Sequence, residues 1–204
     1  FNPFTIEGKK TVGFEIWEQV IFKGGLKKPL NVFVSVGDGN IISGVHKGFK
    51  DLMELGWLDE MPRIFGVQAE GSAAVANAFE AGSEDIQAVS AETLADSISV
   101  DNPSDGLRAL RAATQTGGKY VKVSDQQILE AIATLGTEAI FSEPAAATAY
   151  AGLVKAVELG YLQADDPALV LLTGSGLKDV GAAIKAVQTA PIVEPSLEAF
   201  KKLI

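Results

Sequence analysis

Residues 31–42, NVFVSVGDGNII, indicate the fold class, because a run of apolar and β-branched residues there ends in a glycine-rich turn. The run at 31–36 is almost continuously apolar, which is typical of a strand covered on both faces. The turn Gly37-Asp38-Gly39 follows at once, and a helical pattern begins at Ile42. This order of strand, tight turn and helix predicts one β–α unit of a parallel sheet.

The same alternation continues along the chain. Apolar strand patterns lie at 31–36, 63–68, 120–123 and 168–172, and helical patterns lie at 11–22, 42–55, 73–81, 104–115, 124–135, 144–159 and 177–188. The mixed stretch 82–102 is expected to hold a short helix and a strand near 96–100, and the start at Phe1 reads as a turn. We predict an α/β fold with a doubly wound, mostly parallel sheet and no internal domain boundary.

Helix ends support these assignments. Ser124 with Gln127 three residues later forms a capping-box pattern, and Pro144 suits the first turn of a helix. Gly56 and Gly160 stand where glycines end helices in the left-handed conformation.

Composition excludes several classes of function. Cysteine is absent, which excludes thiol catalysis, zinc–thiolate sites and disulfide scaffolds. With 17 basic and 26 acidic residues, the net charge of −9 disfavours partners such as nucleic acid or an anionic membrane. No apolar run is long enough to span a bilayer and no signal peptide opens the chain, so we expect a cytoplasmic protein.

Two glycine-rich turns are the candidate binding elements. One is Gly37-Asp38-Gly39-Asn40-Ile41, and the other runs from Leu172 through Thr173-Gly174-Ser175-Gly176 to Lys178. Each follows a predicted strand and precedes a helix, where backbone N–H groups suit a phosphate. The first turn is neither a P-loop nor a dinucleotide fingerprint, and a tight turn without ligand is the alternative reading. In a parallel sheet, ligands bind at the carboxyl ends of the strands, where both turns are expected.

Motifs along the whole chain resemble the threonine synthase family, within the pyridoxal-phosphate enzymes of the tryptophan-synthase-β type (fold type II). In family order, the matching segments are Phe4-x-x-Glu7-Gly8-Lys9-Lys10-Thr11, 36–42 (VGDGNII), 47–49 (KGF), 66–71 (GVQAEG), 101–103 (DNP), 142–145 (SEPA) and 172–179 (LTGSGLKD). The family reaction converts O-phospho-L-homoserine and water to L-threonine and phosphate.

The resemblance implies specific site residues. Gly37, Asp38, Gly39, Asn40 and Ile41 would hold the phosphate of pyridoxal 5'-phosphate, and Thr173 would contact the ring nitrogen. Glu143 and Asn102 are possible pocket residues, and no metal is implied. Asp38 beside a phosphate is unfavourable unless its side chain turns away.

The resemblance also concerns what lies outside the chain. In such enzymes the Schiff-base lysine precedes the segment that matches Phe4–Thr11, and residues 1–204 contain no counterpart of that portion. We therefore expect residues 1–204 to be the C-terminal part of the cofactor-binding large domain, with no catalytic lysine and no activity alone. The missing N-terminal segment and a second copy, forming a homodimer, are the expected partners.

Two other functions stay open from the sequence. A related enzyme such as a serine/threonine dehydratase or a cysteine synthase would use the same phosphate turn, and a non-catalytic module could bind a phosphorylated small molecule. His46, the only histidine, is predicted to be a surface or helix-packing residue. Lys47, Lys50, Lys155 and Lys178 read as solvated helix ends, with Lys178 nearest a glycine turn.

Overall fold

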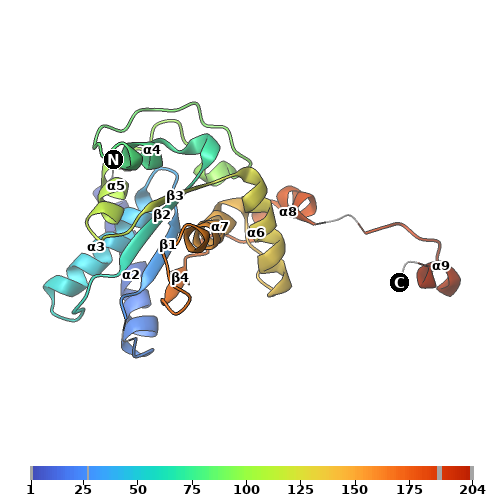
Figure 1. Cartoon of the computed structure of the whole chain (residues 1–204), viewed down its shortest axis with the longest axis horizontal. Coiled ribbons are helices and arrows are strands. Elements are labelled where there is room, and N and C mark those ends of the chain that lie inside the picture. Colours follow the sequence, from blue (N-terminus) through green and yellow to red (C-terminus); the bar gives the residue numbers. More distant parts are fainter. Residues whose placement is uncertain (1, 27, 188–189, 203–204) are drawn as a thin grey trace.

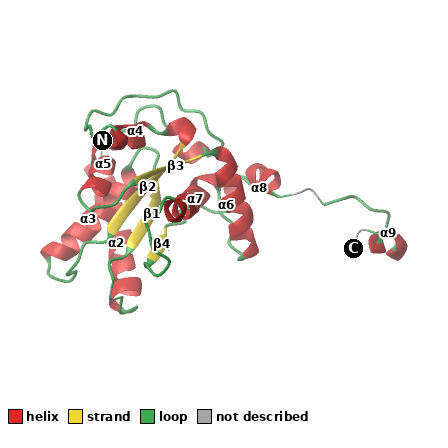
Figure 2. Cartoon of the chain, in the orientation of Figure 1, coloured by secondary structure: helices red, strands yellow, loops and turns green. Residues whose placement is uncertain are grey.

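A four-stranded parallel sheet organises the computed structural model, which describes residues 2–26, 28–187 and 190–202. The strand order is β3-β2-β1-β4 (Figures 1 and 2). The strands are β1 (Asn31–Ser35), β2 (Arg63–Ala69), β3 (Tyr120–Val123) and β4 (Ala168–Val170). All pairings are parallel, with Phe33 of β1 opposite Phe65 of β2 and Val170 of β4.

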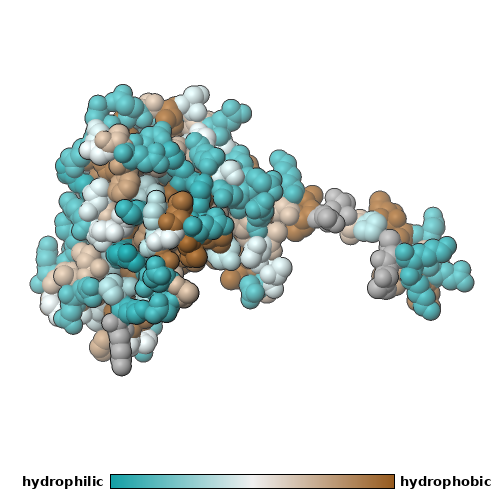
Figure 3. Space-filling view, in the orientation of Figure 1, coloured by the Kyte–Doolittle hydropathy of each residue, from teal (hydrophilic) through white to brown (hydrophobic). Residues whose placement is uncertain are grey.

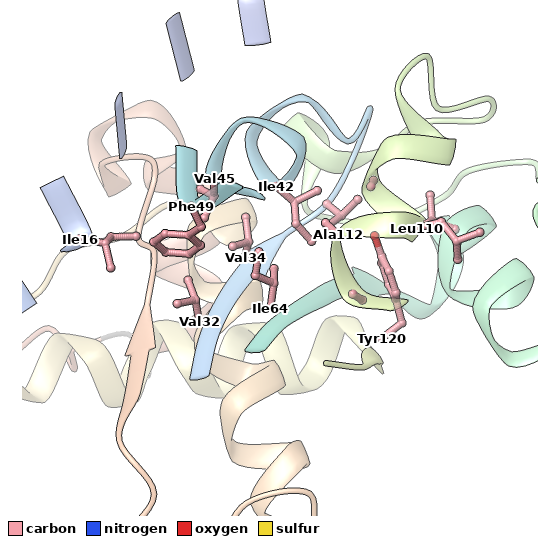
Figure 4. Close-up of a cluster of buried hydrophobic side chains, with 14 of the residues drawn as sticks. Ile16, Val32, Val34, Ile42, Val45, Phe49, Ile64, Leu110, Ala112 and Tyr120 are labelled. Carbon is pink, nitrogen blue, oxygen red and sulfur yellow. The ribbon is translucent and has the colours of Figure 1, made fainter. Parts of the chain in front are cut away.

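Helices cover both faces of the sheet, which confirms the doubly wound prediction. Val32 and Val34 of β1 point into one core with α2 (Thr11–Ile16), α3 (Asn40–Glu54), α4 (Ala74–Glu80) and α5 (Gly106–Thr114), as Figure 4 shows. Phe33 points into the opposite core, with α6 (Asp125–Thr137), α7 (Pro144–Glu158) and α8 (Val180–Ala186). Successive strand residues face opposite sides, so one strand supplies both cores.

Near the N-terminus the structure is more helical than the sequence pattern suggested. Phe1, where the sequence suggested a turn, lies outside the described residues. α1 (Pro3–Lys9) begins at Pro3, with the backbone N–H of Phe4 donating to the Asn2 side chain. The predicted helix at 11–22 divides into α2 and a π-helical segment, Trp17–Phe22. A Cβ at Gly48 would lie 2.3 Å from the carbonyl oxygen of Lys10, so glycine lets this N-terminal corner pack directly on α3.

The strand predicted near 96–100 is absent. A 3-10 turn, Asp96–Ile98, occupies this stretch. The Ser72 hydroxyl accepts from the backbone N–H of Val100 at 3.0 Å and donates to the carbonyl oxygen of Ile98 at 3.0 Å. These polar groups are satisfied by a side chain and a turn, so the segment needs no neighbouring strand.

The predicted helix ends are confirmed along the chain: the capping box at Ser124, Pro144 in the first turn of α7, and the left-handed Gly56 and Gly160. The last strand and helix agree with the sequence pattern only in part. β4 ends earlier than predicted, and its first residue is exposed, because β4 pairs only with β1 among the described strands. The helix predicted at 177–188 begins with a 3-10 turn, Gly176–Lys178, before α8, and Gln188 lies outside the described residues.

The molecular surface is mostly hydrophilic in the view of Figure 3. Apolar side chains gather over α7, where Val154 and Val157 are exposed, and on α9 (Leu197–Lys201), which lies apart from the sheet (Figures 1 and 3). Within the described part of the chain, no helix has the length and apolar character needed to cross a membrane.

Glycine packing tests this arrangement of α7 against β2. A Cβ at Gly152 would lie 2.3 Å from Val67 Cγ2, so Gly152→Ala should lower the free energy of unfolding by about 1–3 kcal/mol through overpacking. At Gly136 in α6 a Cβ would meet nothing within 4 Å. Gly136→Ala should therefore raise the free energy of unfolding by about 0.5–1 kcal/mol. Urea unfolding of both variants measures the difference, and equal effects would contradict the packing.

Candidate functional site

A cavity of about 290 Å³ lies at the carboxyl ends of β1 and β4 and brings both glycine-rich turns together. The first turn contributes Gly37, Asp38, Gly39, Asn40 and Ile41, and the second contributes Thr173. Glu143, which precedes α7, also lines the cavity. The parallel pairing of β1 with β4 explains this meeting, since it places the two turns side by side at one edge of the sheet.

The first turn has to be glycine-rich for steric reasons. Gly39 has φ +89°, a left-handed conformation that other residues rarely adopt, and a Cβ there would lie 2.7 Å from Ala109 Cβ. A Cβ at Gly37 would lie 2.9 Å from the Cα of Ile98. The backbone therefore passes between α5 and the 96–98 turn, and only glycine fits at both positions.

The same turn starts α3 with unoccupied backbone donors. Gly39 is the N-cap residue and its carbonyl accepts from the N–H of Ser43 at 3.1 Å, but no side chain caps the helix in the described structure. The N–H groups of the first turn of a helix lack intrahelical acceptors and carry the positive end of the helix dipole. This helix start is consequently suited to an anionic group such as phosphate.

Asp38 is held away from these donors by hydrogen bonds to another segment. Its Oδ1 accepts from the backbone N–H of Ser104 at 3.1 Å and from the Ser104 hydroxyl at 3.0 Å. Its carbonyl oxygen accepts from the N–H of Asp105 at 2.9 Å. The carboxylate is bound to the segment that leads into α5, which meets the condition that the sequence set for an acidic residue here.

The second turn is joined to the start of α7. Ser142 and Ser175 form an antiparallel bridge, and the backbone N–H of Glu143 donates to the carbonyl oxygen of Gly174 at 3.1 Å. A Cβ at Gly174 would lie 1.8 Å from Glu143 Oε1, so glycine leaves room for the carboxylate. Thr173, one residue earlier, lines the cavity and is exposed.

An ion pair crosses the mouth of the cavity. Lys178 Nζ lies 2.6 Å from Glu143 Oε2, and the carboxylate side chain is only 7% exposed whereas that of the lysine is 58% exposed. Lys178 ends the 3-10 turn Gly176–Lys178 and is exposed, as predicted, and it also supplies the charge that a buried carboxylate requires. The other lysine in the lining, Lys9, belongs to the motif at Phe4–Thr11, and the sequence did not predict it as a site residue.

Other expected and missed residues have clear positions. Asn102 is exposed and does not line this cavity, whereas Ser35 at the end of β1 and Ser97 do. Serines carry no distinctive sequence signal, although the position of Ser35 directly before the turn could have indicated it. His46 is buried on α3, as a packing residue would be, and the described residues include no cluster of metal-ligating side chains.

A family model described as "Pyridoxal-phosphate dependent enzyme" matches residues 1–174, which include the first turn and every strand. The chain belongs to this family of pyridoxal-phosphate dependent enzymes. Its cofactor is accordingly pyridoxal 5'-phosphate.

Similar proteins agree with membership of this pyridoxal-phosphate dependent family. Threonine synthases of Methanocaldococcus jannaschii and Methanosarcina acetivorans are 38% and 35% identical over all of this chain and 50% of their own length. The chain thus spans about half the length of these curated relatives.

Among solved structures, threonine deaminase isoform 2 of Solanum lycopersicum superposes with a TM-score of 0.69 at 23% identity, covering 89% of this chain and 46% of that one. Maize serine racemase gives 0.67 at 22% identity, covering 89% and 52%. These structural likenesses confirm the fold, that of fold type II pyridoxal-phosphate enzymes.

Two features of the cavity in this pyridoxal-phosphate dependent chain suit the cofactor. A phosphate needs several converging donors with no intruding side chain, and the Gly37–Ile41 turn offers backbone donors where a Cβ would clash. The start of α3 has no capping side chain in the described residues, so its donors are left for a ligand. These residues would hold the phosphate, and Thr173 lies in the same cavity for the ring.

Replacement of Gly39 tests the phosphate turn. Gly39→Ala should weaken binding of pyridoxal 5'-phosphate at least about tenfold, because the new Cβ meets α5 and strains the left-handed residue. Gly82→Ala is the matched control, since Gly82 also has a positive φ (+63°) but a Cβ there meets nothing within 4 Å. Absorbance titration with the cofactor measures both, and equal affinities in the two variants would refute the assignment.

Proposed function

We propose that the protein containing these residues is a threonine synthase, which converts O-phospho-L-homoserine and water to L-threonine and phosphate. The observation that carries the proposal is identity of 33–38% to several curated threonine synthases, two of which align over the whole chain. Family membership and the cavity support a cofactor enzyme but do not separate this reaction from others on the same fold. Because the chain spans half of these relatives, the activity is proposed for the complete gene product.

The residues of this chain have distinct roles in the proposal. When bound, pyridoxal 5'-phosphate withdraws electrons from the substrate carbons, which is the chemistry that the family's cofactor supplies. The backbone N–H groups at Gly37–Ile41 bind its phosphate and fix its position. The Thr173 hydroxyl contacts the ring nitrogen as a neutral partner, and the Glu143–Lys178 pair keeps a full negative charge from acting alone beside the ring.

We also propose that the lysine joined to the cofactor lies outside residues 1–204. Two lysines line the cavity, and one of them, Lys178, is held by Glu143 at 2.6 Å. Because the chain spans about half the length of its curated relatives, residues 1–204 are proposed to be the C-terminal part of the cofactor-binding domain, inactive alone.

Reductive trapping tests the position of this lysine. Borohydride treatment of the 204-residue chain with pyridoxal 5'-phosphate, followed by peptide mass spectrometry, should give only scattered labelling. Stoichiometric labelling of Lys9 or Lys178 would place the reactive lysine within the chain and contradict the proposal.

Product analysis of the complete gene product tests the reaction. With O-phospho-L-homoserine, threonine and phosphate should appear in equal amounts, and L-threonine or L-serine alone should give no 2-oxo acid. Ammonia and a 2-oxo acid from those amino acids would indicate a dehydratase, which the fold alone equally allows. Cysteine from O-acetylserine and sulfide would indicate a cysteine synthase, and absence of all three activities would favour a binding module.

Thr173→Val separates the ring contact from phosphate binding. The variant should keep cofactor affinity within a few-fold, because the turn at Gly37–Ile41 is intact, and should lower kcat about 10²-fold, as for loss of one positioned hydrogen bond. Thr137→Val is a matched control, since Thr137 ends α6 away from the cavity. A collapse of affinity in Thr173→Val would show that Thr173 does not act on the ring.

A further inference from the structure

A second cavity, of about 340 Å³, lies between α1, α3 and α5, separate from the cofactor cavity. Four cationic side chains line it, Lys47, Lys50, Arg108 and Arg111, against the single carboxylate of Glu7. Carboxylates outside the lining, Asp51, Asp105 and Glu84, pair with Lys47, Arg108 and Arg111, so the net positive charge of the lining comes mainly from Lys50. A positive charge at the rim of a cavity attracts small anions.

One polar group in the wall has no partner. The Ser43 hydroxyl is fully buried and makes no hydrogen bond within the described structure, although the residue lines the cavity and is 4% exposed. A buried hydroxyl without a partner costs stability, and such groups are rare in native proteins. Because its oxygen has almost no accessible surface, the wall has to move before a ligand oxygen can accept from it.

Carboxylates neutralise most of the cationic side chains of the lining, but not all of them. Arg111 binds Glu84 through two hydrogen bonds, Arg108 lies 3.6 Å from Asp105, and Lys47 pairs with Asp51. Among the described residues Lys50 forms no salt bridge, and it is exposed beside His46. Burial, with the charge of Lys50, lowers the pKa of His46 to about 4, so the imidazole is neutral at pH 7 and can donate one hydrogen bond.

We propose that the cavity between α1, α3 and α5 binds a small molecule that carries a phosphate group. Glu84 occupies Nε and Nη2 of Arg111, which leaves Nη1 to donate to a phosphate oxygen. Arg108 lines the same wall, and Lys50 adds charge at the rim. Ser43 and His46 add neutral donors from the buried wall. A volume of about 340 Å³ is within the range of ligand pockets for small metabolites.

The site is connected to the cofactor cavity through one helix. α3 presents its N-terminus to the first cavity and Ser43, His46, Lys47 and Lys50 to the second. Occupation of the second cavity would therefore act on the helix that starts the phosphate turn. This inference goes beyond the proposed function and does not depend on which reaction the enzyme catalyses.

The single histidine makes the test direct. NMR signals of the His46 imidazole are followed while inorganic phosphate is added to the 204-residue chain, with sodium chloride of equal ionic strength as reference. We expect a saturable shift, and a rise in the pKa of His46 above its low starting value, because a bound anion stabilises the protonated ring. Methylphosphonate and malonate as further probes distinguish a phosphate-type ligand from a dicarboxylate.

Substitutions in the lining test whether phosphate binds in the cavity between α1, α3 and α5. Arg111→Gln and Lys50→Gln should each raise the apparent dissociation constant for phosphate about tenfold, whereas Lys119→Gln, which removes an exposed charge outside both cavities, should leave it unchanged. Amide spectra confirm that each variant is folded, and two independent variants guard against local damage.

Three results of the phosphate titrations would overturn the inference: no shift of His46 with phosphate, a shift that chloride reproduces, or equal responses in all variants. Phosphate bound at the Gly37–Ile41 turn would give such equal responses, because both variants leave that turn intact. Stronger binding of malonate than of phosphate would likewise contradict a phosphate ligand. None of these outcomes contradicts cofactor binding or threonine formation, so the two proposals fail separately.

Discussion

The left-handed backbone of Gly39 against α5 is the constraint on which the site depends. It lets the chain turn sharply from β1 into α3 with no side chain between the turn and Ala109. The helix consequently begins with its backbone donors facing the carboxyl edge of the sheet. A larger residue would move α3 away from α5 and would fill the space in which those donors converge.

A second constraint joins the distant parts of the chain to this edge. The pairing of β4 with β1 brings Thr173 to the phosphate turn, and the bridge between Ser142 and Ser175 fixes the start of α7 beside it. Glu143 is then buried, and Lys178 lies within 2.6 Å to balance its charge. The cavity is thus lined by five short segments of the chain, at 9, 35–41, 97–98, 143–145 and 173–178, and none of them forms a site alone.

Patterns of neighbouring residues predicted most of the fold and the position of the two turns. Strand periodicity, the Ser124 capping box and the glycines of the first turn are properties of neighbouring residues, and the sequence alone predicted them. Contacts between residues that are distant in the sequence could not be predicted from such patterns. The Glu143–Lys178 pair and the cavity between α1, α3 and α5 depend on which helices pack together, and the expected strand near 96–100 was replaced by hydrogen bonds from the distant Ser72. Asn102 matched a family motif, yet its exposed position keeps it outside the cavity.

Binding of the cofactor phosphate at the start of α3 can be observed at the backbone amides themselves. Amide proton signals of Gly37, Gly39, Asn40 and Ile41 should move downfield when pyridoxal 5'-phosphate is added to the isotopically labelled chain, because each N–H then donates to an anion. Pyridoxal, which lacks the phosphate, should leave them unchanged. Equal shifts with both compounds, or no shift with either, would contradict the account.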